Sequence, residues 1–291
     1  MLISDIFKNT SLPYLETEIL ISFLNNKSRE YILAHLNEPL SQKLAKKFKI
    51  LEKKRLSGWP IAYLIGHKGF YGLNFAVSPA TLVPRPESEL IVDEIITIVK
   101  NDLNNYSQFP KTAILDVGTG SGALIISIAK ELQKINYSCY KKIDFSATDI
   151  SNTALKIAKQ NSKTHRLDKK IKFYHGDILS PLINRLKNEH LIIAANLPYL
   201  TKEQIKKSPS IQKEPKLALD GGRDGLFYYR KLFLQLFKLK PKPLSITILC
   251  EIDPGQAIKI KNLIKKSFSE TKIKIKKDLA GKKRLLIADL K

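Results

Sequence analysis

The sequence predicts an α/β protein in which a small all-α domain precedes a larger domain, built on a mainly parallel sheet with helices on both faces. Two observations support this prediction. The first part of the chain has apolar residues at helical spacing, and from Pro84 onward apolar runs of strand length alternate with helical patterns. A length of 291 residues also exceeds the usual size of one domain. We therefore expect residues 1–78 to form the first domain with its connector, and residues 79–291 to form the second.

The N-terminal domain is predicted to consist of short amphipathic helices. Apolar stripes at helical spacing run over residues 15–24 and 40–51. Ser28 and Ser41 are of a residue type that commonly caps a helix N-terminus. Residues 58–60, Gly-Trp-Pro, are expected to end the helix before them, because glycine and proline both interrupt a helix.

The elements of the second domain follow in order. Residues 66–75, rich in glycine and aromatic residues, predict a hairpin or a bent connector. Pro86 suits the first position of a helix whose apolar stripe runs over residues 90–99. A helix over residues 123–132 and another capped by Ser151 are also expected. The runs of strand length cover residues 113–117, 143–148, 171–174, 191–195, 244–251, 272–276 and 285–288.

The composition excludes several classes of protein. Hydrophobic residues make up 43% of the chain and charged residues 26%, which is the usage of a globular rather than a disordered or fibrous protein. Cys139 and Cys250 are too few for a disulfide framework, and the five histidines show no metal-ligand spacing, so no metal site is expected. The start of the chain lacks the features of a signal peptide, and no apolar run approaches the ~20 residues of a spanning helix. We expect a cytoplasmic protein without membrane contact.

The net charge of +23, from 50 basic and 27 acidic residues, is the unusual feature of the composition. It is compatible with two explanations. A positive surface attracts nucleic acids or acidic protein partners. Alternatively, lysine has replaced neutral surface residues throughout the chain. The basic residues are spread along the sequence, without a basic tail or a basic segment interleaved with aromatic residues, and both explanations stay open.

Candidate ligand-binding residues follow three of the predicted strands. Gly118, Gly120 and Gly122 come directly after the first strand, where missing side chains let backbone N–H groups and a helix N-terminus approach a ligand. Asp149 ends the second strand, where its carboxylate can accept hydrogen bonds from two ribose hydroxyls. Asp177 follows the third strand, near the expected place of an adenine. Because ligands of such sheets bind at the carboxyl ends of the strands, this pattern predicts a nucleoside-type cofactor.

A dinucleotide is one candidate for that cofactor. Gly118-x-Gly120-x-x-Ala123 satisfies the relaxed dinucleotide fingerprint. However, Asp149 comes about 30 residues after the first glycine, whereas the fingerprint places its acidic residue after about 20. Asp116 before the loop also suits a cationic amino-acid group better than a pyrophosphate. The end of the fourth strand provides a third argument against a dinucleotide.

That fourth strand ends in Asn196-Leu197-Pro198-Tyr199. A planar NH₂ group needs two acceptors to orient it, and the Asn196 side-chain carbonyl and the Leu197 backbone carbonyl are candidates. Pro198 lacks a backbone donor and fixes the turn, and Tyr199 can cover a flat group from one face. By itself the tetrapeptide favours a simpler interpretation, a strand-ending turn with a packed tyrosine. Together with the upstream motifs, it favours a site that methylates an NH₂ group.

Four further segments carry a more specific pattern than the glycine loop. They are Pro60-Ile61-Ala62-Tyr63-Leu64-x-Gly66, residues 77–87 (Val-Ser-Pro-Ala-Thr-Leu-Val-Pro-Arg-Pro-Glu), Glu214-Pro215-x-x-Ala218-Leu219-x-Gly221-Gly222-x-Asp224-Gly225, and residues 278–284 (Asp-Leu-Ala-Gly-Lys-Lys-Arg). With these segments the chain resembles the release factor glutamine methyltransferases, also called protein-(glutamine-N5) methyltransferases, over nearly its whole length. The resemblance implies a class I S-adenosyl-L-methionine-dependent methyltransferase domain, with a Rossmann-like, seven-stranded, mainly parallel sheet.

The resemblance also implies an activity and a partner. The expected reaction methylates the side-chain N5 of the glutamine in the Gly-Gly-Gln motif of class I peptide-chain release factors, with S-adenosyl-L-methionine as methyl donor. The N-terminal domain is expected to recognise that substrate; we expect a monomer and no direct nucleic-acid binding. The expected catalytic residues are Asn196, Leu197, Pro198 and Tyr199. The expected cofactor-binding residues are Arg85, Asp116, Gly118, Thr119, Gly120, Ser121, Gly122, Asp149, Asp177, Ile178 and Asn196.

One position departs from the family pattern. The usual tetrapeptide is Asn-Pro-Pro-Tyr, and Leu197 stands at its second position. The Asn-Leu-Pro-Tyr form is more familiar from rRNA adenine-N6 dimethyltransferases, so adenine-N6 methylation of rRNA or DNA is the alternative function. Those enzymes carry their accessory helices after the catalytic domain, whereas this chain places its helical domain first. A nucleotide-binding oxidoreductase or a non-catalytic binding module is a third hypothesis, from another class.

Overall fold

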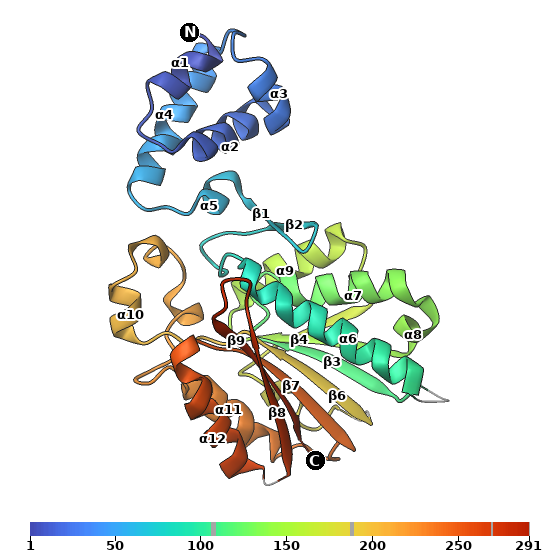
Figure 1. Ribbon diagram of the computed structural model, residues 1–291. Coiled ribbons are helices and arrows are strands. Elements are labelled where there is room, and N and C mark those ends of the chain that lie inside the picture. The colour runs from blue at the N-terminus through green and yellow to red at the C-terminus, as the bar shows by residue number, and fades with distance from the viewer. Residues whose placement is uncertain (106–108, 187–188, 269, 291) are drawn as a thin grey trace. The chain divides into compact units, whose positions relative to one another are not determined.

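The computed structural model describes residues 1–105, 109–186, 189–268 and 270–290 (Figure 1). The chain divides into two compact units. The smaller unit contains Met1–His67 and Ser208–Lys213, and the larger contains Lys68–Lys207 and Glu214–Lys291.

The smaller unit is all-α, as the sequence predicts. Ser28 caps α3 by accepting a hydrogen bond from the Tyr31 amide, and Ser41 caps α4 through the Leu44 amide. The fourth helix ends just before the Gly-Trp-Pro sequence at residues 58–60. The helices are α1 (Ile3–Lys8), α2 (Tyr14–Asn25), α3 (Arg29–Ala34), α4 (Gln42–Leu56) and α5 (Ile61–Ile65).

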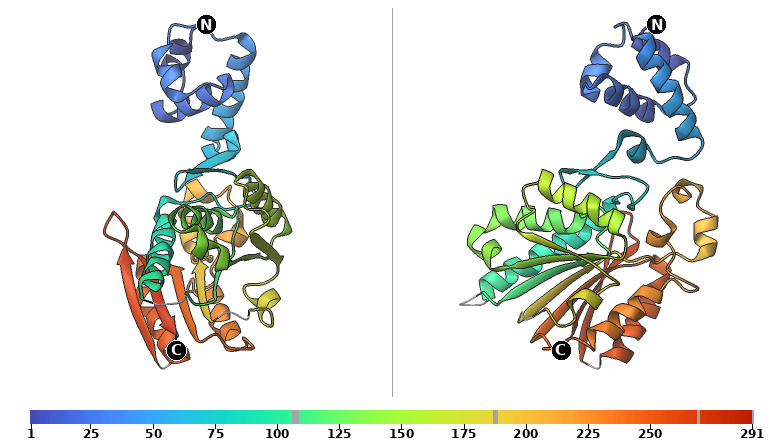
Figure 2. Two further views of the ribbon diagram at one scale, coloured as in Figure 1. Left: turned by 90° about the vertical axis from the view of Figure 1, so that its right-hand side faces the viewer. Right: turned by 180° about the vertical axis from the view of Figure 1, so that it is seen from behind.

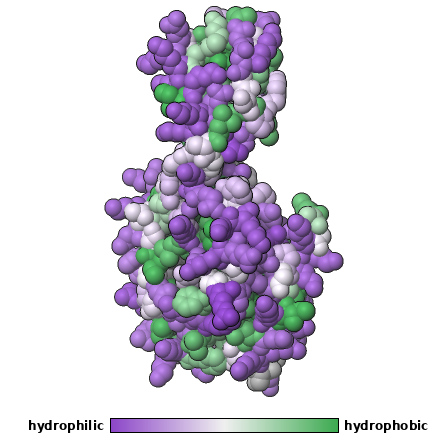
Figure 3. Space-filling view, turned by 90° about the vertical axis from the view of Figure 1, so that its left-hand side faces the viewer, coloured by the Kyte–Doolittle hydropathy of each residue, from purple (hydrophilic) through white to green (hydrophobic). Residues whose placement is uncertain are grey.

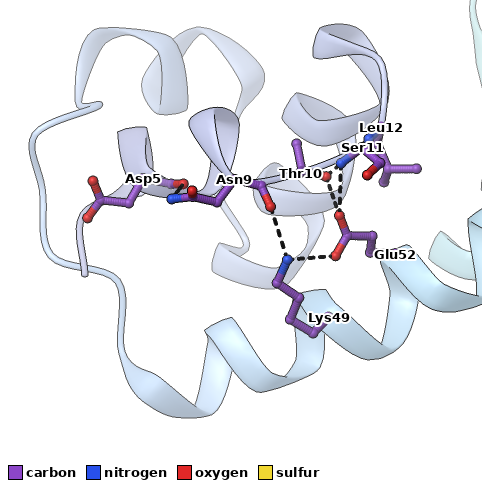
Figure 4. A network of polar contacts seen from close by, with 7 residues as sticks. All are labelled: Asp5, Asn9, Thr10, Ser11, Leu12, Lys49 and Glu52. Atoms are coloured by element: carbon purple, nitrogen blue, oxygen red, sulfur yellow. Dashed lines mark hydrogen bonds and ion pairs between the residues drawn. The ribbon is translucent and has the colours of Figure 1, made fainter.

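A polar network fixes the segment between α1 and α2 against α4 (Figure 4). The Glu52 carboxylate accepts hydrogen bonds from the Thr10 hydroxyl and from the Ser11 amide, at 3.2 Å for the latter. Lys49 donates to Glu52 at 2.9 Å and to the Asn9 carbonyl at 3.2 Å. Because Glu52 is buried, these donors are needed to offset the cost of desolvating its carboxylate.

The described part of the larger unit contains a seven-stranded sheet in the order β5-β4-β3-β6-β7-β9-β8 (Figures 1 and 2). Neighbouring strands are parallel from β5 to β7, and β9 is antiparallel to both β7 and β8. This confirms the predicted fold class. The strands are β3 (Thr112–Val117), β4 (Asp144–Asp149), β5 (Ile171–His175), β6 (His190–Ala195), β7 (Ser245–Glu251), β8 (Thr271–Lys277) and β9 (Lys283–Leu290).

Helices cover both faces of this sheet (Figure 1). Alternate residues of each strand enter different cores: Ile114 packs with α6 (Glu89–Asn105) and α7 (Ala123–Ile135), and Leu115 packs with α11 (Phe227–Leu236) and α12 (Ala257–Ser267). The other helices of the unit are α8 (Tyr137–Lys142), α9 (Asn152–Thr164) and α10 (Lys202–Lys206). Short 3₁₀ turns cover Pro86–Ser88, Ser180–Leu182, Pro209–Ile211, Lys216–Ala218 and Pro254–Gln256. Pro86 therefore opens a 3₁₀ turn directly before α6 rather than α6 itself.

The predicted connector forms a hairpin of β1 (His67–Phe70) and β2 (Leu73–Ala76). Phe70 and Phe75 are buried in the core beside α6 and α7, and the Asn161 side chain bonds both backbone groups of Ala76. The first segment of the compact N-terminal unit runs to His67, and the connector after it packs on the sheet domain.

Some of the many lysines have a structural role on the surface of the protein. Figure 3 shows one face of the molecule, on which hydrophilic residues predominate and hydrophobic ones form small separate areas. On the edge strand β8, Lys272, Lys274 and Lys276 alternate with less exposed residues, a pattern that protects a sheet edge from pairing with another chain. Among the described residues, no helix is both long and apolar enough to cross a membrane.

Candidate active site

A cavity of about 360 Å³ lies at the carboxyl ends of β3, β4 and β6, within the larger unit. Its volume falls in the range of small-molecule sites. The parallel register of these strands brings their ends to one edge, so residues far apart in the sequence meet there. The predicted residues that line the cavity are Gly118, Thr119, Gly120, Ser121, Asp149, Asp177, Ile178, Asn196, Leu197 and Pro198.

The glycine loop is held by backbone hydrogen bonds to the end of β4. The Gly118 and Thr119 amides donate to the Thr148 carbonyl at 2.9 and 3.0 Å. Gly120 has a φ of +56°, a conformation that favours glycine, and a Cβ added there would meet no other atom within 4 Å. Gly122 does not line the cavity; a Cβ there would lie 3.0 Å from Ile126, so this glycine serves helix packing.

Asp149 is positioned by two backbone amides. Its Oδ2 accepts from Gly120 and its Oδ1 from Ser151, both at 2.8 Å. Burial raises the pKa of this carboxyl, while these hydrogen bonds and His175 oppose the increase. Each carboxylate oxygen has two lone pairs, so both can accept a further hydrogen bond from a ligand in the cavity.

Asp177 and Ile178 follow β5 and form another part of the wall. The Asp177 carboxylate is paired with Lys231 of α11, and its amide donates to Ser180 at 3.1 Å. Ile178 is buried with a φ of +56°, so it turns the chain sharply beside the cavity.

Among the described residues, no group of three or more histidine, cysteine or acidic side chains could hold a metal ion.

Asp116 lies beneath the glycine loop rather than in the cavity wall. It is 1% exposed, and its Oδ2 accepts from the Thr119 hydroxyl at 2.6 Å. Burial raises the pKa of Asp116 to about 7, against the effect of that hydrogen bond. Asp116 therefore helps to hold the glycine loop through Thr119, and its contact with the cofactor stays a prediction.

On the other side of the cavity, Asn196, Leu197 and Pro198 line the wall and Tyr199 does not. The Tyr199 hydroxyl donates to the buried carboxylate of Glu251 at 3.0 Å, and burial raises the pKa of Tyr199. The sequence led us to expect that the Tyr199 ring covers a flat group of the substrate, whereas here its hydroxyl is bonded to Glu251. Tyr199 instead belongs to a polar network behind the wall.

A second glycine-rich segment packs against the backbone of this tetrapeptide. A Cβ on Gly221 would lie 2.6 Å from the Pro198 carbonyl oxygen, and a Cβ on Gly225 would lie 2.2 Å from that of Tyr199. Gln256 donates to the Tyr199 carbonyl at 2.7 Å. These contacts explain why the chain needs glycine at both positions, since any side chain would displace the tetrapeptide.

Arg85 also lies outside the cavity wall. Its guanidinium pairs with Glu214, whose side chain is 1% exposed and also accepts from the Val83 amide at 3.0 Å. Arg85 and Glu214 come from two different segments that resemble the family. Their pairing ties the connector after β2 to the segment after α10.

Sequence reasoning missed several residues of the wall. The connector contributes a group of them, Ser151 comes from the turn after β4, and Tyr228 comes from α11. Their positions depend on long-range packing, and for the residues within 77–87 the connector motif was the signal that could have found them. The connector residues are Phe70, Pro79, Ala80, Thr81, Leu82, Pro84 and Ser88.

Comparisons with known proteins agree with this organisation. The family model of the PrmC N-terminal domain matches residues 3–66, and that of a methyltransferase domain matches residues 108–216. The release factor glutamine methyltransferase of Bacillus subtilis is 33% identical, covering 93% of this chain and 89% of that protein. That of Coxiella burnetii is 34% identical, covering 95% of this chain and 91% of that protein.

Solved structures share the fold at low sequence identity. The hMettl16 catalytic domain in complex with a MAT2A 3′UTR hairpin matches with a TM-score of 0.54 at 13% identity, covering 93% of this chain and 91% of that one. The N-terminal domain of human METTL16 in complex with SAH matches with a TM-score of 0.52 at 13% identity, covering 93% of both chains. By the extent and identity of its sequence matches, the chain belongs to the release factor glutamine methyltransferase family.

Proposed function

We propose that this protein transfers a methyl group from S-adenosyl-L-methionine to the N5 of the glutamine in the Gly-Gly-Gln motif of class I peptide-chain release factors. The observation that carries the proposal is one cavity whose wall combines the glycine loop and Asp149 with Asn196 and Leu197. The family relationship, over more than nine tenths of the chain, supports a protein glutamine as the acceptor.

The residues present fit this methyl donor. The loop at Gly118–Ser121 leaves open space beside Gly120, and Asp149 has acceptor capacity for two ribose hydroxyls. S-adenosyl-L-methionine supplies a methyl group on a positively charged sulfur, which makes that carbon electrophilic. Asp177, which is paired with Lys231, lies in the same wall, where the adenine is expected.

The chain's own contribution to catalysis is positioning. The Asn196 side-chain oxygen and the Leu197 backbone carbonyl accept from the two hydrogens of the glutamine NH₂, which orients the nitrogen toward the methyl group. Holding reactants in this way is worth on the order of 7–11 kcal/mol. The same two acceptors stabilise the positive charge that develops on nitrogen. The tetrapeptide Asn196–Tyr199 contains no general base, so the proton leaves the nitrogen after the methyl group arrives rather than before.

The experiment compares acceptors in parallel, using labelled S-adenosyl-L-methionine and the purified full-length protein. We expect label on a class I release factor and none when its Gly-Gly-Gln glutamine is replaced by alanine. Ribosomal RNA and DNA are the other acceptors tested. Label on adenine instead would establish the alternative function, for which Leu197 and the net charge are the supporting observations.

We propose that the N-terminal unit recognises the release factor in the cytoplasm, with the protein acting as a monomer. The described residues of this unit, Met1–His67, include no glycine loop or strand-end acid of the kind that lines the cavity. Its match to the PrmC N-terminal domain supports a role specific to this family. If the positive surface steers an acidic face of the substrate, the association rate falls as salt is added.

A further inference from the structure

The side-chain amide of Asn196 is held by a chain of hydrogen bonds that the sequence motif does not contain. Asn196 Nδ2 donates to the Ser88 hydroxyl at 2.9 Å. Ser88 lies in the 3₁₀ turn before α6 and is 3% exposed. Its hydroxyl donates in turn to Oε2 of Glu251, which ends β7 and is 2% exposed. Three segments far apart in the chain therefore meet behind one side chain of the cavity wall.

The direction of these hydrogen bonds follows from counting hydrogens. Both oxygens of Glu251 act as acceptors, Oε2 from Ser88 and Oε1 from Tyr199 at 3.0 Å. A serine hydroxyl has one hydrogen, and Ser88 uses it toward Glu251, so toward Asn196 it can act only as an acceptor. Asn196 must then turn its NH₂ group toward Ser88, which leaves its carbonyl oxygen for a ligand.

We propose that Ser88 and Glu251 are positioning residues for methyl transfer, which fix the Asn196 amide with its oxygen available to the NH₂ group of the substrate. This inference rests on the proposed function. Without the hydrogen-bond chain the amide can turn over, and a turned amide presents NH₂ to NH₂, which cannot form the required hydrogen bond. Tyr199 supports the same arrangement, because its hydroxyl occupies the other oxygen of Glu251.

The charge of Glu251 determines whether the chain keeps this direction. The groups that face Glu251 are Ser88 and Glu87 from the turn before α6, Tyr199 from the loop after β6, Tyr229 from α11, and Arg284 from β9. Burial raises its pKa; the two hydrogen bonds and the charge of Arg284 oppose that increase, and Glu87 adds to it. When Glu251 is protonated it can donate to Ser88, whose hydrogen is then released toward Asn196. Methyl transfer is therefore lost as the pH falls through the pKa of Glu251.

The first test removes the hydroxyl of Ser88 from the full-length protein. In single-turnover assays with release factor, we expect Ser88→Ala to lower kcat about tenfold to a hundredfold, the usual effect of losing a buried hydrogen-bond partner. Ser88→Thr keeps the hydroxyl and is expected to restore most of that rate. The affinity for S-adenosyl-L-methionine, measured by calorimetry, should stay unchanged, which also shows that the variant is folded.

A matched control is Ser127→Ala. Ser127 lies in α7 and is as buried as Ser88, but its hydroxyl has no hydrogen-bond partner among the described residues and so takes no part in the network. Its replacement should leave kcat unchanged. A kcat for Ser88→Ala that stays within twofold of the control would overturn the proposal.

The second test uses a pH profile, which a merely structural role would not alter. Gln in place of Glu251 cannot ionise and can donate to Ser88, so it imitates the protonated acid. We expect Glu251→Gln to have a low kcat at every pH and to lose the acid limb of the wild-type profile. An unchanged acid limb in Glu251→Gln would overturn the role assigned to the charge of Glu251.

A third readout needs no substrate. The side-chain amide signals of Asn196 in an NMR spectrum are identified by their absence in Asn196→Ala. In the wild type we expect slow exchange of these protons with water, and in Ser88→Ala exchange faster by about tenfold or more, because the acceptor is gone. Equal exchange rates would contradict the inference even if release factor were methylated. Absence of any release-factor methylation by the wild type would contradict the proposed function, while this measurement would still test the orientation of the amide.

Discussion

The two sides of the cavity are built in different ways. The side expected to bind the cofactor depends on backbone groups of adjacent strands: the loop at Gly118–Ser121 is pinned to the end of β4, and Asp149 is held by amides of that loop and of Ser151. The side expected to bind the methyl acceptor is held by side chains from distant segments, among them Ser88 and Glu251.

This difference shows where precision is required. A glycine loop next to a parallel strand forms its hydrogen bonds from local backbone, so its geometry tolerates many sequences around it. An amide that must present oxygen rather than nitrogen needs a defined partner, and in this chain that partner is Ser88. We therefore expect substitutions on the acceptor side to change the rate and those on the cofactor side to change affinity.

The largest expected effect is that of Asn196→Ala. It removes an acceptor that acts in the transition state, a loss that costs about 10²–10³ in kcat in comparable sites. The affinity for S-adenosyl-L-methionine should change much less, because the loop, Asp149 and Asp177 are untouched. Single-turnover kinetics combined with calorimetry measure both quantities. Near-wild-type methyl transfer would show that positioning by Asn196 is not the source of the rate.

Asn196→Asp sharpens the same comparison. Aspartate keeps an oxygen of similar geometry but cannot donate to the Ser88 hydroxyl, and it adds a negative charge in front of the buried Glu251. We expect strong impairment of kcat, close to that of Asn196→Ala, in the same single-turnover assay. If the aspartate variant retained most of the activity, the acceptor oxygen would matter and the donor to Ser88 would not.

On the cofactor side, Asp149→Ala should weaken binding of S-adenosyl-L-methionine at least about tenfold, since hydrogen bonds to a charged group are worth about 1.5–3 kcal/mol each. The Gly120 amide also loses its acceptor, which loosens the loop. We expect kcat at saturating cofactor to fall much less than affinity. Calorimetry that shows unchanged affinity in the folded variant would remove Asp149 from the cofactor site.

The contrast between the two sides also explains what the sequence could predict. Glycines and acids at strand ends are local signals in the sequence. The fold class could therefore be predicted from the alternation of strands and helices, and the glycine loop and Asp149 could be assigned to one edge of the sheet. The pairing of Arg85 with Glu214, and of Tyr199 with Glu251, depends on segments brought together by the sheet. No spacing in the sequence encodes such contacts, and both residues were therefore expected at the ligand.

A smaller effect, on stability, is expected from Asp116→Asn. Burial raises the pKa of Asp116 to about 7, so the folded state retains a proton that the unfolded state releases at lower pH. The protonated Asp116 therefore contributes to the free energy of unfolding at low pH, and this contribution is lost as the pH rises toward and through 7. Asparagine cannot ionise, so the melting temperature of the variant, relative to that of the wild type, should rise between pH 5 and pH 8. If the melting temperatures of the two proteins changed with pH in the same way, Asp116 would not titrate in this range.

The smallest expected effect is that of Leu197→Pro, which creates the tetrapeptide usual in the family. Leu197 is 3% exposed, and a Cβ on Gly118 would lie 3.2 Å from its side chain, so proline leaves a little space beside the glycine loop. The backbone carbonyl that we expect to accept from the substrate is kept, and proline also restricts the backbone before Pro198. These effects oppose each other, and kcat should stay within about twofold of the wild type or rise slightly, since ordered acceptors lower the cost of positioning. If Leu197→Pro changed the preferred acceptor in the labelled assay, the side chain at position 197 would select the substrate, and the acceptor side would be less fixed by Ser88 and Glu251 than their contacts indicate.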